Sequence, residues 1–192
     1  MSEKVNIKKT ETIADQKNTL KKVTFDYQKK NGDWQTKTNE LYDMGDATSV
    51  LLYNKEQKKV ILTRQFRLPT YMNGNKSGML IETCAGKLGD ESPEEGIKRE
   101  ILEETGFKID TVQKVMEVYT TPGTVTELLY LFVAAYTDDM KTAEGGGLEE
   151  EQEEVQVMEL PFEEAMNMMK NGEIKDAKTV ILLQYAALMQ LL

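Results

Sequence analysis

The sequence predicts an α/β protein in which an N-terminal strand module precedes a mixed α/β core. Short runs of β-forming residues separated by turn signals occupy most of the chain. Helical spacing of apolar residues is confined to a few segments after the third and last groups of strands. The 192 residues can form one sizeable core but are too few for two ordinary enzyme domains. We therefore expect a strand module over residues 1–45 and a core domain over residues 46–192.

The N-terminal module is expected to be an antiparallel β-hairpin. Residues 18–29 alternate and carry β-formers, the stretch KNGDW supplies an Asn-Gly turn, and residues 35–43 continue as a second strand. In the core, residues 49–54 and 59–67 form two apolar runs separated by the polar stretch KEQK. Such runs suit interior antiparallel strands.

A short strand over residues 78–86 is expected to lead into the first long helix. Ser92 stands at the N-cap position, Pro93 lies in the first turn with acidic residues behind it, and Gly106 occupies the position of a C-terminal cap. The remaining elements are strands over 112–119, 127–137 and 155–160, and helices over 161–170 and 177–191.

Composition and charge exclude several classes of function. The net charge of −9 disfavours nucleic acid as a partner, because binding to a phosphate backbone depends on clustered Lys and Arg. Cys84 is the only cysteine and histidine is absent, so an intrachain disulfide, multi-cysteine metal centres, His-based triads and the common zinc sites are excluded. Catalysis would therefore depend on carboxylates, lysine, tyrosine or water activated by a metal ion.

The chain is expected to be cytoplasmic and without membrane contact. The N-terminal stretch MSEKVNIKKTE lacks the apolar core of a secretory signal. The longest apolar run, residues 180–192, is broken by Gln184 and Gln190 and is shorter than the roughly 20 residues of a membrane span. This run is expected to form a packed terminal helix.

The stretch REILEETG, residues 99–106, concentrates acidic residues on the predicted helix. At about 100° per residue, Glu100, Glu103 and Glu104 fall within an arc of roughly 100°. Like charges at this spacing destabilise a helix unless a cation neutralises them, and hard oxygen ligands suit Mg²⁺ or Mn²⁺. A pair of glutamates alone more often marks a solvated helix face.

Residues 86–107 as a whole resemble the Nudix box of the Nudix hydrolase family. The matching positions are Gly86, Glu91, Arg99, Glu100, Ile101, Glu103, Glu104, Gly106 and Phe107. One departure is that four residues instead of five separate Gly86 from Glu91. The resemblance implies a Nudix α/β/α sandwich with a mixed sheet, and Mg²⁺- or Mn²⁺-dependent hydrolysis of nucleoside diphosphates linked to another moiety. Arg99 would orient a glutamate.

Further segments are similar to the GDP-mannose pyrophosphatase branch of this family, which is close to the ADP-ribose pyrophosphatases. They include RQFR at 64–67, IETCAG at 81–86, PGTVTE at 122–127 and ELPF at 159–162. The resemblance implies hydrolysis of a nucleotide sugar, foremost GDP-mannose to GMP and mannose 1-phosphate, by a homodimer whose N-terminal hairpin covers the partner's active site. The alternatives are an ADP-ribose pyrophosphatase and a non-catalytic Nudix-fold sensor of nucleotide sugars.

The same resemblance implies a set of site residues at the matching positions. The Ala85 carbonyl, Glu100 and Glu104 would hold the metal, and Glu103 of the same box would take part in catalysis. The residues expected to contact substrate are Arg67, Glu40, Glu127 and Lys178. Arg67 could instead be a surface charge at a strand end, and Lys178 a charge at a helix N-terminus.

The resemblance further implies that a glutamate of the acidic loop GLEEEQEEVQV would complete the metal site or activate water. Counting back from ELPF indicates Glu153, whereas counting forward from the glycines indicates Glu151. The stretch Thr38-Asn39-Glu40 lacks the Arg that the branch usually carries beside this Glu, which weakens the assignment of GDP-mannose as substrate.

Overall fold

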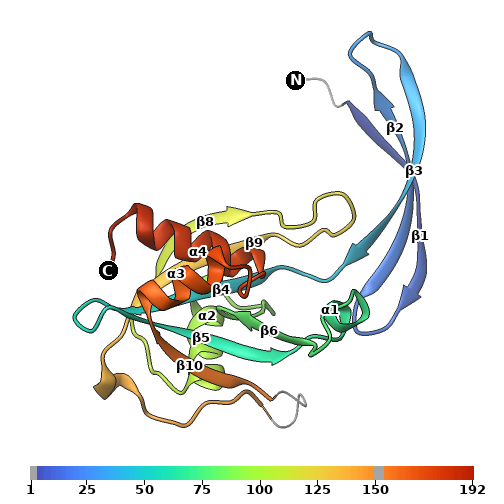
Figure 1. Ribbon diagram of the computed structural model, residues 1–192. Helices are drawn as coiled ribbons and strands as arrows, with labels where there is room; N and C mark the ends of the chain where they lie inside the picture. The colour runs from blue at the N-terminus through green and yellow to red at the C-terminus, as the bar shows by residue number, and fades with distance from the viewer. Residues whose placement is uncertain (1–3, 149–153) are drawn as a thin grey trace. The chain divides into compact units, whose positions relative to one another are not determined.

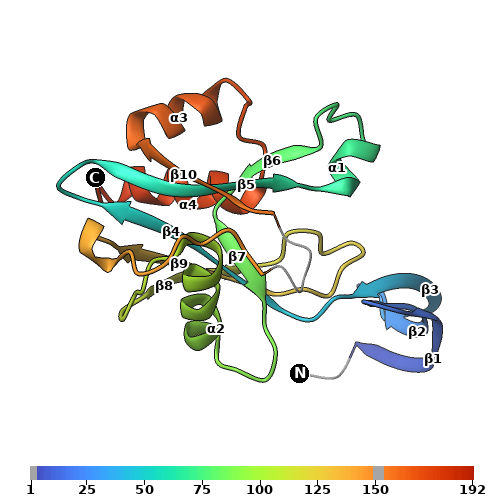
Figure 2. The same cartoon turned by 90° about the horizontal axis from the view of Figure 1, so that it is seen from below.

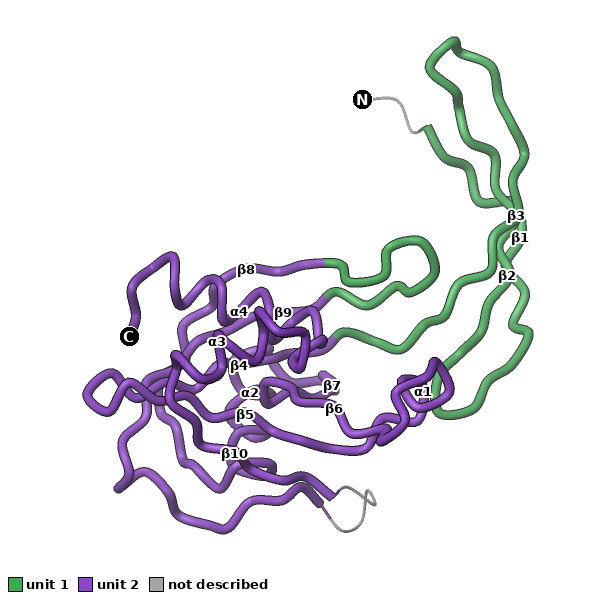
Figure 3. The backbone as a smooth tube through the Cα atoms, viewed as in Figure 1, with its two compact units in different colours: residues 1–46, 119–128 green, residues 47–118, 129–192 purple. Residues whose placement is uncertain are grey.

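The computed structural model describes residues 4–148 and 154–192. It divides into two compact units, residues 1–46 with 119–128 and residues 47–118 with 129–192, which Figure 3 colours separately. The first unit therefore includes segment 119–128 in addition to the N-terminal strands. Among the described residues, none of the helices reaches the length and apolarity of a membrane span.

The first unit contains a three-stranded antiparallel sheet in the order β1 (Val5–Asp15), β2 (Thr19–Gln28) and β3 (Trp34–Asp43). Strands β2 and β3 are the predicted hairpin. Strand β1 extends it and was not predicted, because all but one of its side chains are exposed and charged residues interrupt the alternation of Val5, Ile7 and Ile13. Segment 119–128 joins the end of β3, where the amide of Tyr42 donates to the carbonyl of Thr124 at 2.8 Å.

The second unit contains a mixed sheet in the order β10-β5-β4-β9-β8, in which β4 and β9 are parallel and the other neighbours antiparallel (Figure 1). Two short strands fill the region between diverging parts of β4 and β5, with β6 pairing β5 and β7 pairing β4. The strand bounds are β4 (Ala47–Asn54), β5 (Lys59–Phe66), β6 (Met79–Glu82), β7 (Cys84–Lys87), β8 (Gln113–Val118), β9 (Leu129–Ala135) and β10 (Gln156–Pro161).

Residues 78–86, predicted as one strand, form two strands because the chain changes partner at Thr83. The amide of Thr83 donates to Thr179 Oγ1 at 2.7 Å, and its hydroxyl lies 2.8 Å from Ser49 Oγ. The first contact satisfies a backbone amide that a continuous ladder would otherwise bond, and the second satisfies a buried hydroxyl. The break separates Glu82 at the end of β6 from Ala85 within β7, so the two residues belong to different strands.

Helices cover both faces of this sheet, which confirms the expected Nudix-type α/β/α sandwich (Figures 1 and 2). On one face, α3 (Phe162–Lys170) and α4 (Ala177–Leu188) pack over a core that includes Leu51, Leu131 and Leu182. On the other face, α2 (Pro93–Glu100) packs over a core that includes Val50, Ile97 and Phe132. A short helix that was not predicted, α1 (Leu68–Met72), connects β5 to β6 and buries no side chain.

Candidate active site

The acidic helix begins as predicted but changes its winding before it ends. At its start, Ser92 and Glu95 form a capping box, with Ser92 Oγ accepting from the Glu95 amide. After Glu100 the chain continues as a π-helical turn, Ile101–Thr105, and stops at Gly106, whose φ of 76° is left-handed. A π-turn contains more residues than an α-turn, so the angular spacing expected for Glu103 and Glu104 does not hold. Such turns are frequent at functional sites.

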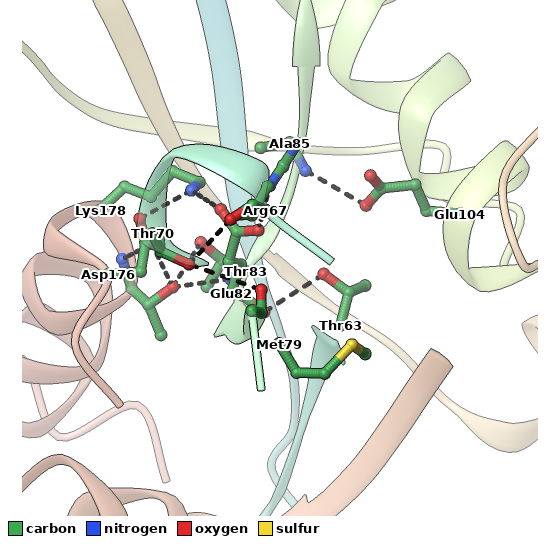
Figure 4. Close-up of polar contacts among 12 residues, drawn as sticks. Thr63, Arg67, Thr70, Met79, Glu82, Thr83, Ala85, Glu104, Asp176 and Lys178 are labelled. Atoms are coloured by element: carbon green, nitrogen blue, oxygen red, sulfur yellow. Dashed lines mark hydrogen bonds and ion pairs between the residues drawn. The ribbon is translucent and has the colours of Figure 1, made fainter. Parts of the chain in front are cut away.

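The carboxylates of Glu100 and Glu104 both lie against strand β7. A Cβ atom added to Gly86 would overlap the carboxyl group of Glu100, so this position must be glycine for Glu100 to occupy its place. Glu104 is 2% exposed, and its Oε2 accepts a hydrogen bond from the Ala85 amide at 3.3 Å (Figure 4). The structure therefore brings the three predicted metal-site residues together.

Burial also changes the pKa of the Cys84 thiol, which lies beside Ala85 and Glu104. Cys84 is fully buried, and burial is the largest cause that raises its pKa, followed by the neighbouring Glu104. The thiol is therefore protonated and is a poor metal ligand or nucleophile at neutral pH. Oxygen atoms remain as the ligands that this part of the site can offer.

Arg99 binds three carboxylates, those of Glu91 in the preceding loop and of Glu100 and Glu103 on the helix. Its Nη2 lies 2.6 Å from Glu91 Oε1, and its Nη1 lies 2.9 Å from Glu100 Oε1 and 2.8 Å from Glu103 Oε2. The hydrogen bond to Glu91 is the largest cause that raises the pKa of Arg99. Glu91 thus reaches its partner although the preceding loop is one residue short. One guanidinium against three carboxylates leaves an excess of negative charge that favours a divalent cation nearby.

Thr48 is a further candidate for the site, which the sequence did not reveal. It lies directly opposite Gly86 in the β4–β7 pair, so its side chain is on the sheet face that α2 covers. Within the described part of the chain its hydroxyl is buried and has no hydrogen-bond partner. An unsatisfied buried hydroxyl is costly, and a hydrated cation at this face would supply a partner. A threonine within an apolar strand carries no signal that could have identified it.

Arg67 and Lys178, predicted from separate motifs, meet at the buried carboxylate of Glu82 (Figure 4). Arg67 Nε donates to Glu82 Oε2 at 2.6 Å, and Lys178 Nζ donates to Glu82 Oε1 at 2.5 Å. Lys178 also donates to Asp176, the N-cap residue of α4, at 2.8 Å. Burial alone would lower the pKa of Lys178, but Glu82 and Asp176 more than offset it, so the pKa is raised. Lys178 therefore stays charged at neutral pH.

The glycine triplet 145–147 packs tightly against the end of the acidic helix. The amide of Gly146 donates to the carbonyl of Glu104 at 2.8 Å, and the amide of Gly147 donates to that of Glu103 at 3.1 Å. A Cβ at Gly145 would overlap backbone atoms of residues 104–106. Val155 in turn donates to the carbonyl of Gly146 at 3.0 Å. The segment that carries the predicted Glu151 and Glu153 therefore starts and ends beside the helix, while these two residues themselves lie outside the described range.

The other predicted site residues are distributed as follows. Glu103 contacts Arg99, whereas Glu40 and Glu127 belong to the first unit. Within residues 4–148 and 154–192, no three Asp, Glu or Cys side chains are arranged to ligate one ion. Two carboxylates and a backbone carbonyl nevertheless fit Mg²⁺ or Mn²⁺, which commonly take few protein ligands and leave positions for water and phosphate oxygens. The arrangement suits metal-assisted attack on a phosphate ester or anhydride.

Comparison with known proteins agrees with this geometry. Residues 43–183 match the NUDIX domain, and residues 4–42 match the domain described as the GDP-mannose pyrophosphatase NudK N-terminal domain. The chain is 48% identical over 185 residues to the GDP-mannose pyrophosphatase of Enterobacter sp. (strain 638), with 96% of each chain covered. It is 44% identical over 192 residues to that of Shigella flexneri, with 100% of each chain covered. The chain therefore belongs to the Nudix family.

Proposed function

We propose that this chain is a Nudix pyrophosphatase that hydrolyses the pyrophosphate bond of a nucleotide sugar, with GDP-mannose converted to GMP and mannose 1-phosphate. One observation carries the proposal: a cluster of carboxylates and a pair of cations lie on either side of the strand break at Thr83. Glu82 and Ala85 are three residues apart, a separation of at most about 10 Å. A diphosphate can therefore meet metal ligands and cationic side chains at once. The names of relatives at 44–48% identity support GDP-mannose as substrate.

The site residues of this chain form two groups, one that would bind a cation and one that would bind the substrate. Glu100, Glu104 and the Ala85 carbonyl would hold Mg²⁺ or Mn²⁺, and Arg99 keeps Glu100 and Glu103 in place. A bound divalent cation supplies neutralisation of the diphosphate oxygens and lowers the pKa of water. Arg67 and Lys178 would donate hydrogen bonds to phosphate oxygens, because charge-assisted bonds of this kind are the strong ones.

A glutamate of the acidic loop is proposed to accept the proton of the attacking water. Glu153 is the first candidate and Glu151 the second. Support comes from the hydrogen bonds of Gly146, Gly147 and Val155, which hold both ends of this loop beside Glu103 and Glu104. Comparing Glu153→Gln with Glu151→Gln tests the assignment, since only the base should show a large loss of kcat. If both variants are as active as the wild-type protein, neither residue accepts the proton of the attacking water.

The first unit is proposed to form a homodimer and to contribute Glu40 and Glu127 to substrate binding. Within this unit, a groove of about 520 Å³ is lined by apolar side chains that include Val5, Leu41 and Tyr119. Ile7 and Tyr119 are each more than half exposed, as is typical of a surface that another chain covers. Light scattering on the wild-type protein and on Ile7→Glu tests the dimer. The cytoplasmic location stays a prediction.

ADP-ribose is the second candidate substrate, because the stretch around Glu40 lacks an Arg that the GDP-mannose branch usually carries. A non-catalytic sensor is the less favoured reading, since the carboxylates of Glu100 and Glu104 are both present and face the same strand.

A substrate panel tests the proposed activity. The purified protein is incubated with Mg²⁺ or Mn²⁺ and GDP-mannose, ADP-ribose or other nucleotide sugars, and products are separated by ion-exchange chromatography. We expect GMP and mannose 1-phosphate in equal amounts, and no products when a chelator replaces the metal. Preferential cleavage of ADP-ribose would show that ADP-ribose, and not GDP-mannose, is the substrate. Binding of a nucleotide sugar without cleavage would support the alternative of a non-catalytic sensor.

A further inference from the structure

Glu82 is a buried carboxylate that joins two cations from distant parts of the sequence. Its side chain is 4% exposed, and each of its two oxygens accepts from one cation, Arg67 on one side and Lys178 on the other. A buried carboxylate is stabilised only when it is paired and hydrogen-bonded, and here the pairing is complete on both oxygens. Glu82 therefore determines where both cationic groups lie.

The two cations are anchored to different degrees. Lys178 is 13% exposed and has three N–H donors, of which Glu82 and Asp176 receive two. Asp176 is itself fixed, because its other oxygen accepts from the amide and the hydroxyl of Thr179. Arg67 is anchored at Nε, while 39% of its side chain remains exposed. Its backbone amide donates to the carbonyl of Gly78 at 2.8 Å.

We propose that Glu82 is a positioning residue that fixes Arg67 and Lys178 as one paired cation site for the phosphate groups of a nucleotide sugar. The inference rests on the proposed function and deepens it. Glu82 does not contact substrate itself: both of its oxygens face the cations. Its charge also offsets the repulsion between two cations held by the same group, which would otherwise separate them. Correct placement matters because phosphate recognition depends on the direction of each N–H group.

Glu82→Gln tests the proposal with almost no change in shape. The amide can accept from one cation only and presents N–H groups to the other, so the pair should separate. We expect the KM for GDP-mannose to rise about tenfold or more with a smaller change in kcat, since the lost contacts serve substrate binding. Affinity for Mn²⁺, measured by calorimetry without substrate, should stay within about twofold of wild type.

Two controls distinguish positioning from a structural role. Glu159→Gln removes the charge of another ion-paired glutamate, which contacts Lys59 at 3.2 Å and Tyr136 at 2.8 Å, and should leave KM unchanged. In a Lys178→Met background, Glu82→Gln should raise KM by clearly less than it does in the wild type, because one of its partners is already absent. If Glu82→Gln alone fails to fold, Glu82→Gln/Lys178→Met is compared directly with Lys178→Met. The KM of the double variant should then exceed that of Lys178→Met by less than about tenfold, because only Arg67 still loses its partner, and a larger increase contradicts the inference.

The outcomes separate this inference from the proposed function. If the wild-type protein hydrolyses GDP-mannose but Glu82→Gln has an unchanged KM, the inference is overturned and the function stands. Glu82→Gln could also raise KM in the Lys178→Met background by as much as it does in the wild-type background, or lower the affinity for Mn²⁺ by the same factor as it raises KM. Either result would show that Glu82 acts on the fold, and would also overturn the inference. A wild-type protein that cleaves no nucleotide sugar would remove the proposed function and this inference together.

Discussion

Gly86→Ala is the substitution whose effect follows most directly from the structure. Gly86 has an ordinary extended backbone, so alanine imposes no backbone strain. The new methyl group would occupy the position of the Glu100 carboxyl group. To restore an ordinary contact of about 3.5 Å, the carboxylate must move by roughly 1.5 Å. Metal–oxygen bonds of about 2.1 Å tolerate only a few tenths of an ångström, so Glu100 would cease to be a ligand.

The expected loss is large in activity and small in stability. A displacement of about 1 Å in a catalytic group costs on the order of 100-fold in rate, so we expect at least this loss of kcat for GDP-mannose. The melting temperature of the metal-free protein should change less than the activity, because the extended backbone at Gly86 accommodates alanine without strain. Rates are measured from GMP formation, and Mn²⁺ affinity is measured by calorimetry.

Gly89→Ala, in the loop that follows β7, is the matched control, since a Cβ at Gly89 meets nothing within 4 Å. It should have wild-type activity and Mn²⁺ affinity. If Gly86→Ala binds Mn²⁺ as tightly as the wild-type protein does, the reasoning is refuted. Glu100 could then leave its position over β7 without loss of the metal site.

The remaining predictions concern Glu104, Thr48 and Lys178. Glu104→Gln should lower kcat by at least about 100-fold and leave the circular dichroism spectrum unchanged, whereas undiminished turnover would count against Glu104 as a metal ligand. Thr48→Val should raise the free energy of unfolding of the metal-free protein, by up to about 1 kcal/mol, because it removes a buried hydroxyl without a partner among the described residues; chemical denaturation checks this, and a destabilised variant would contradict it. The pKa of Lys178 is raised above its ordinary value of 10.5, so the stability that its charge contributes is complete below that value and is lost as the pH rises through the higher folded pKa. The difference in unfolding free energy between the wild-type protein and Lys178→Met should therefore stay constant from about pH 7 to about pH 9 and change only in more alkaline solution; a change already near neutral pH would show that Lys178 is not held in its charged form.

Hydrophobic patterning predicted most of the second unit, because its strands and helices have one or two buried faces. The runs at 49–54 and 59–67 became β4 and β5, and Ser92-Pro93 marked the start of α2 correctly. Patterning missed β1, whose side chains are nearly all exposed, and α1, which has five residues and buries none. In β1, charged residues interrupt the apolar alternation, and α1 is too short to show a helical period.

Tertiary contacts explain what local sequence could not predict at the site. The Nudix box predicted that Glu100 and Glu104 share a site, and both carboxylates lie against β7, but their metal binding stays a prediction. The angular argument for Glu103 assumed an α-helix where the chain forms a π-turn. The partner of Arg67 and Lys178 was not predicted, because three segments distant in sequence converge on Glu82. The glycine triplet 145–147 likewise depends on close backbone contact with the helix end, which composition does not reveal.

The central claim is that the carboxylates of Glu100 and Glu104, held over strand β7 beside Ala85, form a divalent-cation site. Calorimetric titration of the metal-free protein with Mn²⁺ measures this without reference to any substrate. We predict saturable binding to the wild-type protein and loss of that binding in Glu100→Gln/Glu104→Gln. Equal affinity of the two proteins for Mn²⁺ would contradict the account.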